Sequence, residues 1–117
     1  MKKIEAIVSS LKVRSVAAAL LEARFSALTI AAAVGFGQGV GSSGELPVPM
    51  TVLEIVVGNW QVEAVLEIIA GCTRTGRRGD GIIHVSHIEQ AVRIRTGERH
   101  HDAIRSHWSN RATVFAP

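Results

Sequence analysis

The alternation of polar and apolar positions divides this 117-residue chain into two similar units, each a strand, a helix and a strand. In the first unit, residues 3–8 alternate polar and apolar in their first half, as a half-buried strand does. After Ser9 and Ser10, whose hydroxyls suit a helix N-cap, residues 11–23 carry apolar side chains at helical spacing. Residues 28–36 resume as a strand. Its three consecutive alanines are poor strand formers and indicate close cover by a helix or by another subunit.

The second unit repeats this order. It contains a strand at 51–57, a helix at about 60–72, a loop at 73–81 and a strand that begins at 82 and ends at 87 or 88. A further short extended segment is expected at 91–95. Two such units predict an α+β, ferredoxin-like βαββαβ sandwich, with an antiparallel sheet and both helices on one face. Self-association is the obvious way to cover the other face.

Between the units, residues 38–50 contain three glycines and two prolines and are expected to form a short mobile surface loop. The polar, histidine-rich residues 98–117 are expected to form a C-terminal tail. We therefore expect one domain at residues 1–97, because the chain is too short for two cores.

The composition narrows the class of protein. Hydrophobic residues make up 47% and charged residues 20%, which argues against disorder, and aromatic residues make up only 4%. The expected strands thus lack the aromatic side chains on which RNA bases stack, so no nucleic-acid partner is expected.

Cellular location follows from three further observations. The single Cys72 excludes an internal disulfide, and we expect it to be a small buried residue near a helix end. Lys2 and Lys3 precede Ile4-Glu5 rather than an unbroken apolar region, so no signal peptide is expected. The longest apolar stretch, residues 27–36, is too short to span a bilayer. These features indicate a cytoplasmic protein without membrane insertion.

The net charge of +3 is unevenly distributed. Seven of the 13 basic residues are arginines between positions 74 and 105: Arg74, Arg77, Arg78, Arg93, Arg95, Arg99 and Arg105. Paired guanidinium N–H groups suit phosphate or carboxylate recognition. A solvated face, or ion pairs between subunits, would use the same residues.

Three segments carry candidate binding chemistry. The loop at 73–81 contains three glycines and three arginines, and its successive backbone N–H groups favour anion binding, although it lacks the ending of a Walker loop. Arg93 and Arg95, two positions apart on an extended segment, would present two guanidinium groups on one side. The Gly-Phe-Gly sequence at 35–37 would let a ligand approach the backbone, or would act as a hinge.

Residues 1–7, 35–37, 75–81 and 93–98 together resemble the PII nitrogen-regulatory family in order and nearly in spacing. The resemblance covers residues 1–37 and 51 to about 104. It implies a homotrimer that binds adenine nucleotides in three clefts between subunits and regulates a partner protein, such as a transporter or an enzyme. The residues it assigns to the cleft are Thr29, Gly35, Phe36, Gly37, Gln38, Glu54, Val56, Gly79, Asp80, Gly81, Ile82, Arg93 and Arg95.

The chain also departs from the family's pattern. Ile82 stands where the family usually has a lysine that contacts the outer phosphates, which predicts a preference for ADP or AMP over ATP. The loop after Gly37 is short and has no tyrosine to modify, and Gln38 is displaced from the position that helps to place Mg²⁺ and 2-oxoglutarate. Similar short loops occur in divergent PII-like proteins associated with bicarbonate uptake and carboxysomes, so bicarbonate is a candidate signal.

Two alternatives stay open: a nitrogen-status regulator that senses ATP and 2-oxoglutarate, and a structural or metal-tolerance trimer of the same fold. No enzyme activity is expected, because no motif pairs Glu54 or Asp80 with a histidine or serine. No metal site is expected either, because His84 and His87 lie three apart on a strand and face opposite sides.

Overall fold

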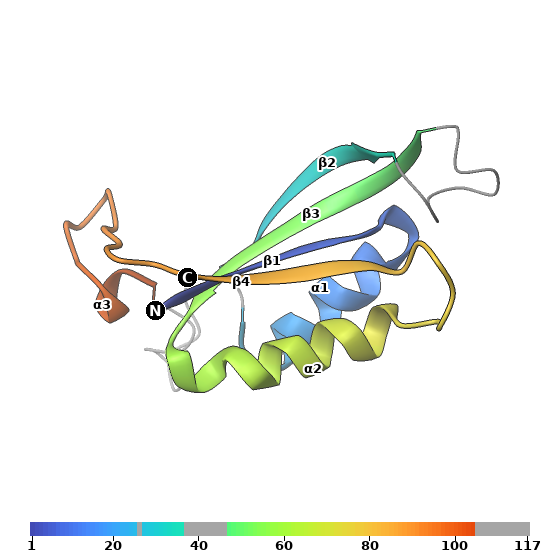
Figure 1. The fold of residues 1–117 in the computed structure, drawn as a ribbon. Helices are drawn as coiled ribbons and strands as arrows, with labels where there is room; N and C mark the ends of the chain where they lie inside the picture. Colours follow the sequence, from blue (N-terminus) through green and yellow to red (C-terminus); the bar gives the residue numbers. More distant parts are fainter. Residues whose placement is uncertain (26, 37–46, 105–117) are drawn as a thin grey trace.

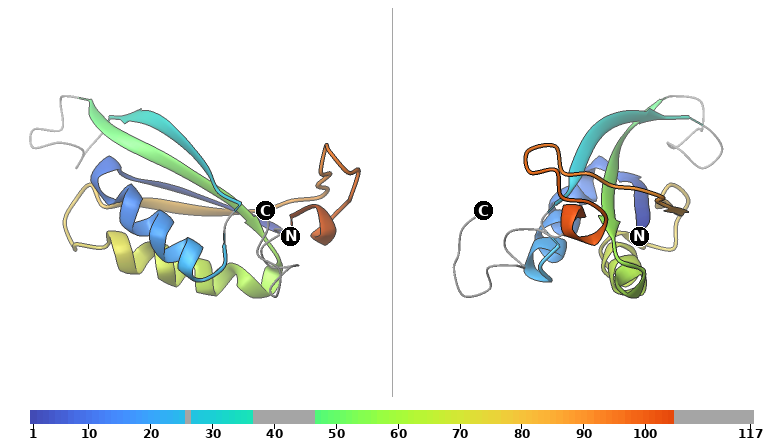
Figure 2. Two further views of the ribbon diagram at one scale, coloured as in Figure 1. Left: turned by 180° about the vertical axis from the view of Figure 1, so that it is seen from behind. Right: turned by 90° about the vertical axis from the view of Figure 1, so that its left-hand side faces the viewer.

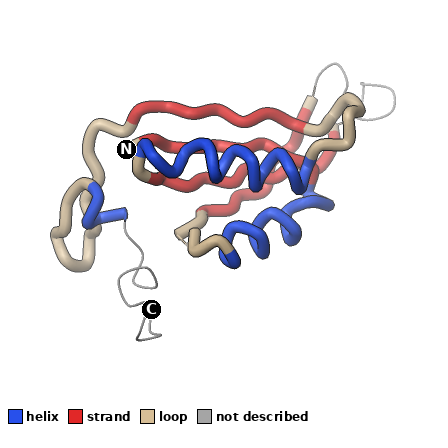
Figure 3. Tube along the Cα trace, turned by 90° about the horizontal axis from the view of Figure 1, so that it is seen from below, coloured by secondary structure: helices blue, strands red, loops and turns tan. Residues whose placement is uncertain are grey.

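The computed structural model describes residues 1–25, 27–36 and 47–104 of the chain. Its elements are β1 (Lys2–Ser9), α1 (Val13–Glu22), β2 (Thr29–Gly35), β3 (Val48–Val57), α2 (Val62–Thr73), β4 (Gly81–His87) and α3 (His101–Ile104). The strands form one antiparallel sheet in the order β2-β3-β1-β4, and α1 and α2 lie together on one face of it (Figures 1 and 3). This architecture confirms the expected ferredoxin-like fold.

The core lies between the sheet and the two long helices. Alternate residues of β1, namely Ile4, Ala6 and Val8, are at most 1% exposed, as the alternating pattern predicts. Leu20 of α1 and Ile69 of α2 cover them and are equally buried. Full burial of an isoleucine or leucine side chain stabilises a fold by about 1.5–3 kcal/mol. The helices are therefore held on the sheet mainly by aliphatic packing.

The two long helices leave the opposite face of the sheet open (Figure 2). We call it the open face. The register places two rows of directly opposed residues across it, because opposed residues in an antiparallel sheet share a face. The apolar row is Ala31–Val52–Ile7–Ile82 and the polar row is Thr29–Glu54–Glu5–His84. In the polar row, His84 Nδ1 lies 3.6 Å from Glu5 Oε1.

Strand β2 is exposed along most of its length, including the alanines at 31 and 32. Neither long helix covers it, so the close cover expected from its composition is not supplied by α1 or α2.

Several boundaries differ from the sequence prediction. β3 begins at Val48 rather than Thr51, so the loop expected at 38–50 is wrong over its last three residues. Pro49 is tolerated there because β1 pairs with β3 only from Met50 onward, which leaves Pro49 with one neighbouring strand. Both long helices are preceded by single 3₁₀ turns, at Ser10–Lys12 and Asn59–Gln61. Ser9 caps the first turn by accepting a hydrogen bond from Leu11 N, as expected.

The segment after β4 is more structured than predicted. Val92 and Arg99 form an antiparallel bridge around a turn, where an extended segment at 91–95 was expected. α3 follows, in the part of the chain that was expected to be a tail. The His101 ring lies 5.2 Å from the ring of Trp60, which is 73% exposed rather than packed in the core. No helix of the described residues is long and apolar enough to cross a membrane.

We predict that Gly81→Ala destabilises the fold. Gly81 has a φ of +111°, and a Cβ there would lie 2.0 Å from the backbone oxygen of Ile7. The combined strain and clash should lower the free energy of unfolding by at least about 2 kcal/mol. Gly71→Ala is the matched control, because Gly71 lies in α2 with no atom near the added methyl group, and it should raise stability by about 0.5–1 kcal/mol. Urea denaturation measures both; equal stabilities for the two variants would contradict the prediction.

Candidate functional site

A cleft of about 250 Å³ opens where β2 begins and β3 nears its end. It is lined by Ala27, Thr29, Glu54, Ile55, Val56, Arg93, Ala103 and Ile104. Four of these residues, Thr29, Glu54, Val56 and Arg93, belong to the predicted site. The structure therefore brings these four residues together from two strands and the C-terminal segment, although Thr29 and Arg93 are 64 positions apart in the sequence.

The strand register explains how the first wall of the cleft forms. Thr29 is directly opposite Glu54 across the β2–β3 pair, and Val56 is two positions further along the same side of β3. The Glu54 carboxylate lies 3.9 Å from Lys3 Nζ on β1. This wall thus offers a hydroxyl, a carboxylate with a nearby cation, and an apolar side chain.

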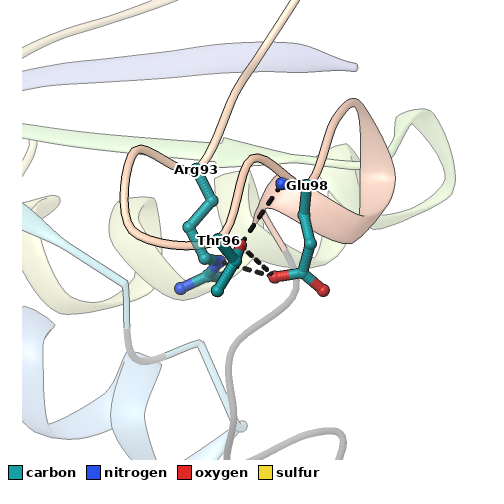
Figure 4. Close-up of polar contacts among 3 residues, drawn as sticks. All are labelled: Arg93, Thr96 and Glu98. Carbon is teal, nitrogen blue, oxygen red and sulfur yellow. Dashed lines mark hydrogen bonds and ion pairs between the residues drawn. The ribbon is translucent and has the colours of Figure 1, made fainter.

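The second wall comes from the turn at 93–98 (Figure 4). Arg93 N donates to Glu98 O at 2.8 Å and Gly97 N donates to Arg93 O at 2.7 Å, and Gly97 takes a φ of +78°. The Arg93 side chain, 24% exposed, has its Nε 3.4 Å from Glu98 Oε1. The turn corrects our expectation that Arg93 and Arg95 point the same way from an extended segment. Arg93 lines the cleft, and Arg95 is not among its lining residues.

The glycine-arginine loop between α2 and β4 is organised by Asp80. The Asp80 carboxylate accepts hydrogen bonds from Thr75 Oγ1 at 2.5 Å, from Thr75 N at 2.7 Å and from Gly76 N at 3.0 Å. These bonds, the Thr75 side chain first, hold the pKa of Asp80 below its ordinary value of 3.8. The Asp80 side chain therefore closes the loop.

The loop also shapes a smaller pocket of about 160 Å³ beside β4. Asp80, Gly81 and Ile82 line it, together with residues of β1 and α2. Gly79 and Gly81 have positive φ values of +91° and +111°. Residues with a Cβ rarely adopt such angles, so glycine is required at these two positions.

The predicted site residues thus fall into separate groups within one chain. Gly81 is opposite Val8 on β1, whereas Glu54 is opposite Glu5, about 10 Å back along the strand at about 3.4 Å per residue. Gly35 is at the far end of β2 from Thr29, and Phe36 beyond it is 70% exposed. The cleft and the loop pocket share no lining residue. Gly37 and Gln38 lie outside the described residues.

Sequence reasoning missed the apolar part of the cleft. Ala103 and Ile104 were placed in the tail, and Ala27 precedes the expected strand; none of them belongs to a motif. Among the described residues, no group of three or more histidine, cysteine, aspartate or glutamate side chains is arranged to hold a metal ion.

Comparison with known proteins places this geometry in a family. The family model described as "Nitrogen regulatory protein P-II" matches residues 1–98. Proteins called nitrogen regulatory protein P-II are 44% identical in Mesorhizobium japonicum and 44% identical in Bradyrhizobium diazoefficiens. Each alignment covers 89% of this chain and all of the relative. The crystal structure of Arabidopsis thaliana PII bound to citrate superimposes with a TM-score of 0.78 at 35% identity over 90% of both chains.

The match to this family, on a chain with the four-stranded sheet and two helices on one face, identifies a small regulatory protein of the signal-transduction class. The chain belongs to the nitrogen regulatory protein P-II family.

We predict that Asp80 titrates below pH 3.8. Because its pKa is lowered in the folded protein, its stabilising effect on the loop is present above pH 3.8 and is lost as the pH falls through the lower, folded value. Carboxyl carbon NMR of the Asp80 side chain measures the midpoint. Thr75→Val removes the largest cause and should move the midpoint up toward 3.8; an unchanged midpoint in this variant would contradict the assignment of the cause.

Proposed function

We propose that this chain is a P-II-type regulator that binds an adenine nucleotide, with ADP or AMP favoured over ATP, and transmits the bound state to a partner protein. The observation that carries the proposal is the cleft that joins Thr29, Glu54 and Val56 to Arg93. Nothing in the proposal requires a chemical step, so the protein is a binding protein and not an enzyme.

The chemistry of the cleft suits a nucleotide. A hydroxyl and a carboxylate beside apolar residues can accept and donate hydrogen bonds at the edge of a base while its flat face packs on Val56. Arg93 supplies a cation for a phosphate group on the opposite wall. A cleft of about 250 Å³ is below the about 300–1,000 Å³ of typical ligand pockets, which supports a site that a second copy of the chain completes.

We propose that the assembly is a homotrimer in which the loop at 75–81 of one copy meets the cleft of the next. The separation of the cleft from the loop within one chain supports this arrangement. The open face and the exposed β2 edge supply apolar surface for it, in particular the row that contains Val52 and Ile7.

The preference for ADP or AMP rests on the residue after the loop. Ile82 is 54% exposed and lines the pocket beside Gly81, so an apolar side chain stands where a cation would reach the outer phosphates. Fewer positive charges there weaken a longer phosphate chain more than a shorter one.

We propose inorganic carbon status, sensed as bicarbonate, as the signal, because the loop after Gly37 is short. The alignment with the Mesorhizobium relative runs over 112 residues but covers 89% of this chain, about 104 residues, which supports a deletion of about eight residues in total. The names of the relatives favour the alternative, a nitrogen-status regulator that senses ATP and 2-oxoglutarate. A cytoplasmic location and a transporter or enzyme as target follow from either.

We predict that calorimetry detects binding of AMP and ADP, with ATP weaker, and that Arg93→Ala weakens ADP binding about tenfold to a hundredfold because a charge-assisted hydrogen bond is lost. Ile82→Lys should tighten ATP binding more than AMP binding. Adding bicarbonate or 2-oxoglutarate separates the two signals. A wild-type protein that binds ATP tenfold more tightly than ADP, or binds no adenine nucleotide, would contradict the proposal.

We predict that the protein sediments at three times its chain mass of 12.5 kDa. Val52→Asp places a charge in the middle of the apolar row and should shift the equilibrium toward monomer, since an unpaired buried charge is costly. Leu11→Gln is the control, because Leu11 is 91% exposed in the turn before α1. Analytical ultracentrifugation measures the oligomeric state of both variants. A Val52→Asp variant that remains fully trimeric would exclude the open face as the contact surface between subunits.

A further inference from the structure

The turn at 93–98 contains a carboxylate that has not been assigned a role. Glu98 Oε1 lies 3.4 Å from Arg93 Nε and accepts a hydrogen bond from Thr96 Oγ1 at 2.8 Å. Thr96 Oγ1 in turn accepts a hydrogen bond from Glu98 N at 3.2 Å (Figure 4). The Glu98 carboxylate is therefore held by the Thr96 hydroxyl, which the Glu98 backbone N–H holds in turn, while it contacts the arginine of the cleft.

The backbone strengthens this arrangement. The hydrogen bond from Arg93 N to Glu98 O and the bridge between Val92 and Arg99 fix the two ends of the turn against each other. Arg93 and Glu98 thus face one another at a constant separation, and the contact between their side chains does not depend on a ligand. An arginine side chain that is free to rotate loses this freedom when it binds a phosphate, and that loss weakens binding.

We propose that Glu98 is a positioning residue, which holds the guanidinium of Arg93 at the wall of the cleft before the ligand arrives. The inference rests on the proposed nucleotide function and adds to it: the phosphate contact is preorganised by a carboxylate within the same turn. Glu98 acts through Arg93 and does not itself touch the ligand.

A competing electrostatic effect has the opposite sign. The negative charge of Glu98 repels a phosphate, so its removal alone would strengthen the binding of an anion. The two effects separate in Glu98→Gln, which removes the charge but keeps a side chain of the same shape beside Arg93 Nε, with an oxygen that can accept from Thr96 Oγ1. Glu98→Ala removes both the charge and the acceptor.

The experiment compares AMP with adenosine, because only AMP carries the phosphate that Arg93 is proposed to contact. Glu98→Ala should bind AMP about threefold to tenfold more weakly and adenosine as the wild type does. The affinity of Glu98→Gln for AMP should be equal to that of the wild type or higher, with a loss of no more than about twofold. In an Arg93→Ala background, Glu98→Ala should no longer weaken AMP binding, and the loss of the Glu98 charge should leave the affinity unchanged or slightly higher. Glu89→Ala is the control for charge, since it removes the same charge from the same segment outside the cleft lining.

Three outcomes would overturn the inference: an unchanged AMP affinity in Glu98→Ala, an equal loss for AMP and adenosine, or a Glu98→Gln variant as weak as the alanine variant. A wild type that binds neither AMP nor adenosine would instead count against the proposed function. In that case, a measurement without ligand still tests whether Glu98 positions Arg93. The Arg93 Nε–H signal in ¹⁵N NMR, assigned with Arg93→Ala, should exchange with water more slowly in the wild type and Glu98→Gln than in Glu98→Ala, and equal rates in all three would refute the positioning role.

Discussion

The packing of two helices onto one face of a four-stranded sheet is the constraint on which the other features of this structure depend. Alternate residues of β1 and β3 are buried in the aliphatic core, together with one side of α1 and one side of α2. The remaining alternate residues necessarily face the other way, because neighbouring side chains of a strand point to opposite faces. Glu54 and Val56 are available for a cleft because their neighbours Leu53 and Val57 point to the other face and are buried in the core.

The two elements that we propose to bind phosphate are built by different physical means. In the loop at 75–81, one carboxylate closes the backbone by accepting three hydrogen bonds, and glycines with positive φ allow the sharp path that follows. In the turn at 93–98, a carboxylate is held by its own turn and contacts an arginine side chain. In both cases an acidic residue organises a segment rich in positive charge. The acidic residue in each basic segment thus holds the local structure and does not serve only to lower the net positive charge of the segment.

Much of the fold was predictable, because its core uses short-range patterns. The alternation in the first half of residues 3–8 and the helical spacing at about 60–72 each indicate one buried face, and the order of the elements then restricts the sheet to few topologies. Boundaries were less predictable where the chain violates local preference. Pro49 argued against a strand, yet β3 includes it because no β1 residue needs its missing N–H. The turn at Ile94–Thr96 was missed because the bridge between Val92 and Arg99 depends on residues seven positions apart.

The sequence by itself determined the family, the alternating core and the two motifs that carry positive charge, since each of these is written in residues close together along the chain. Only the tertiary structure decided which motif residues meet. It brought Arg93 to Thr29 and Glu54, separated them from Gly81, and turned Asp80 inward to its own loop. The physical reason is that contacts across a sheet follow from strand register and chain reversal, and these are settled by the packing of the whole domain rather than by any one segment.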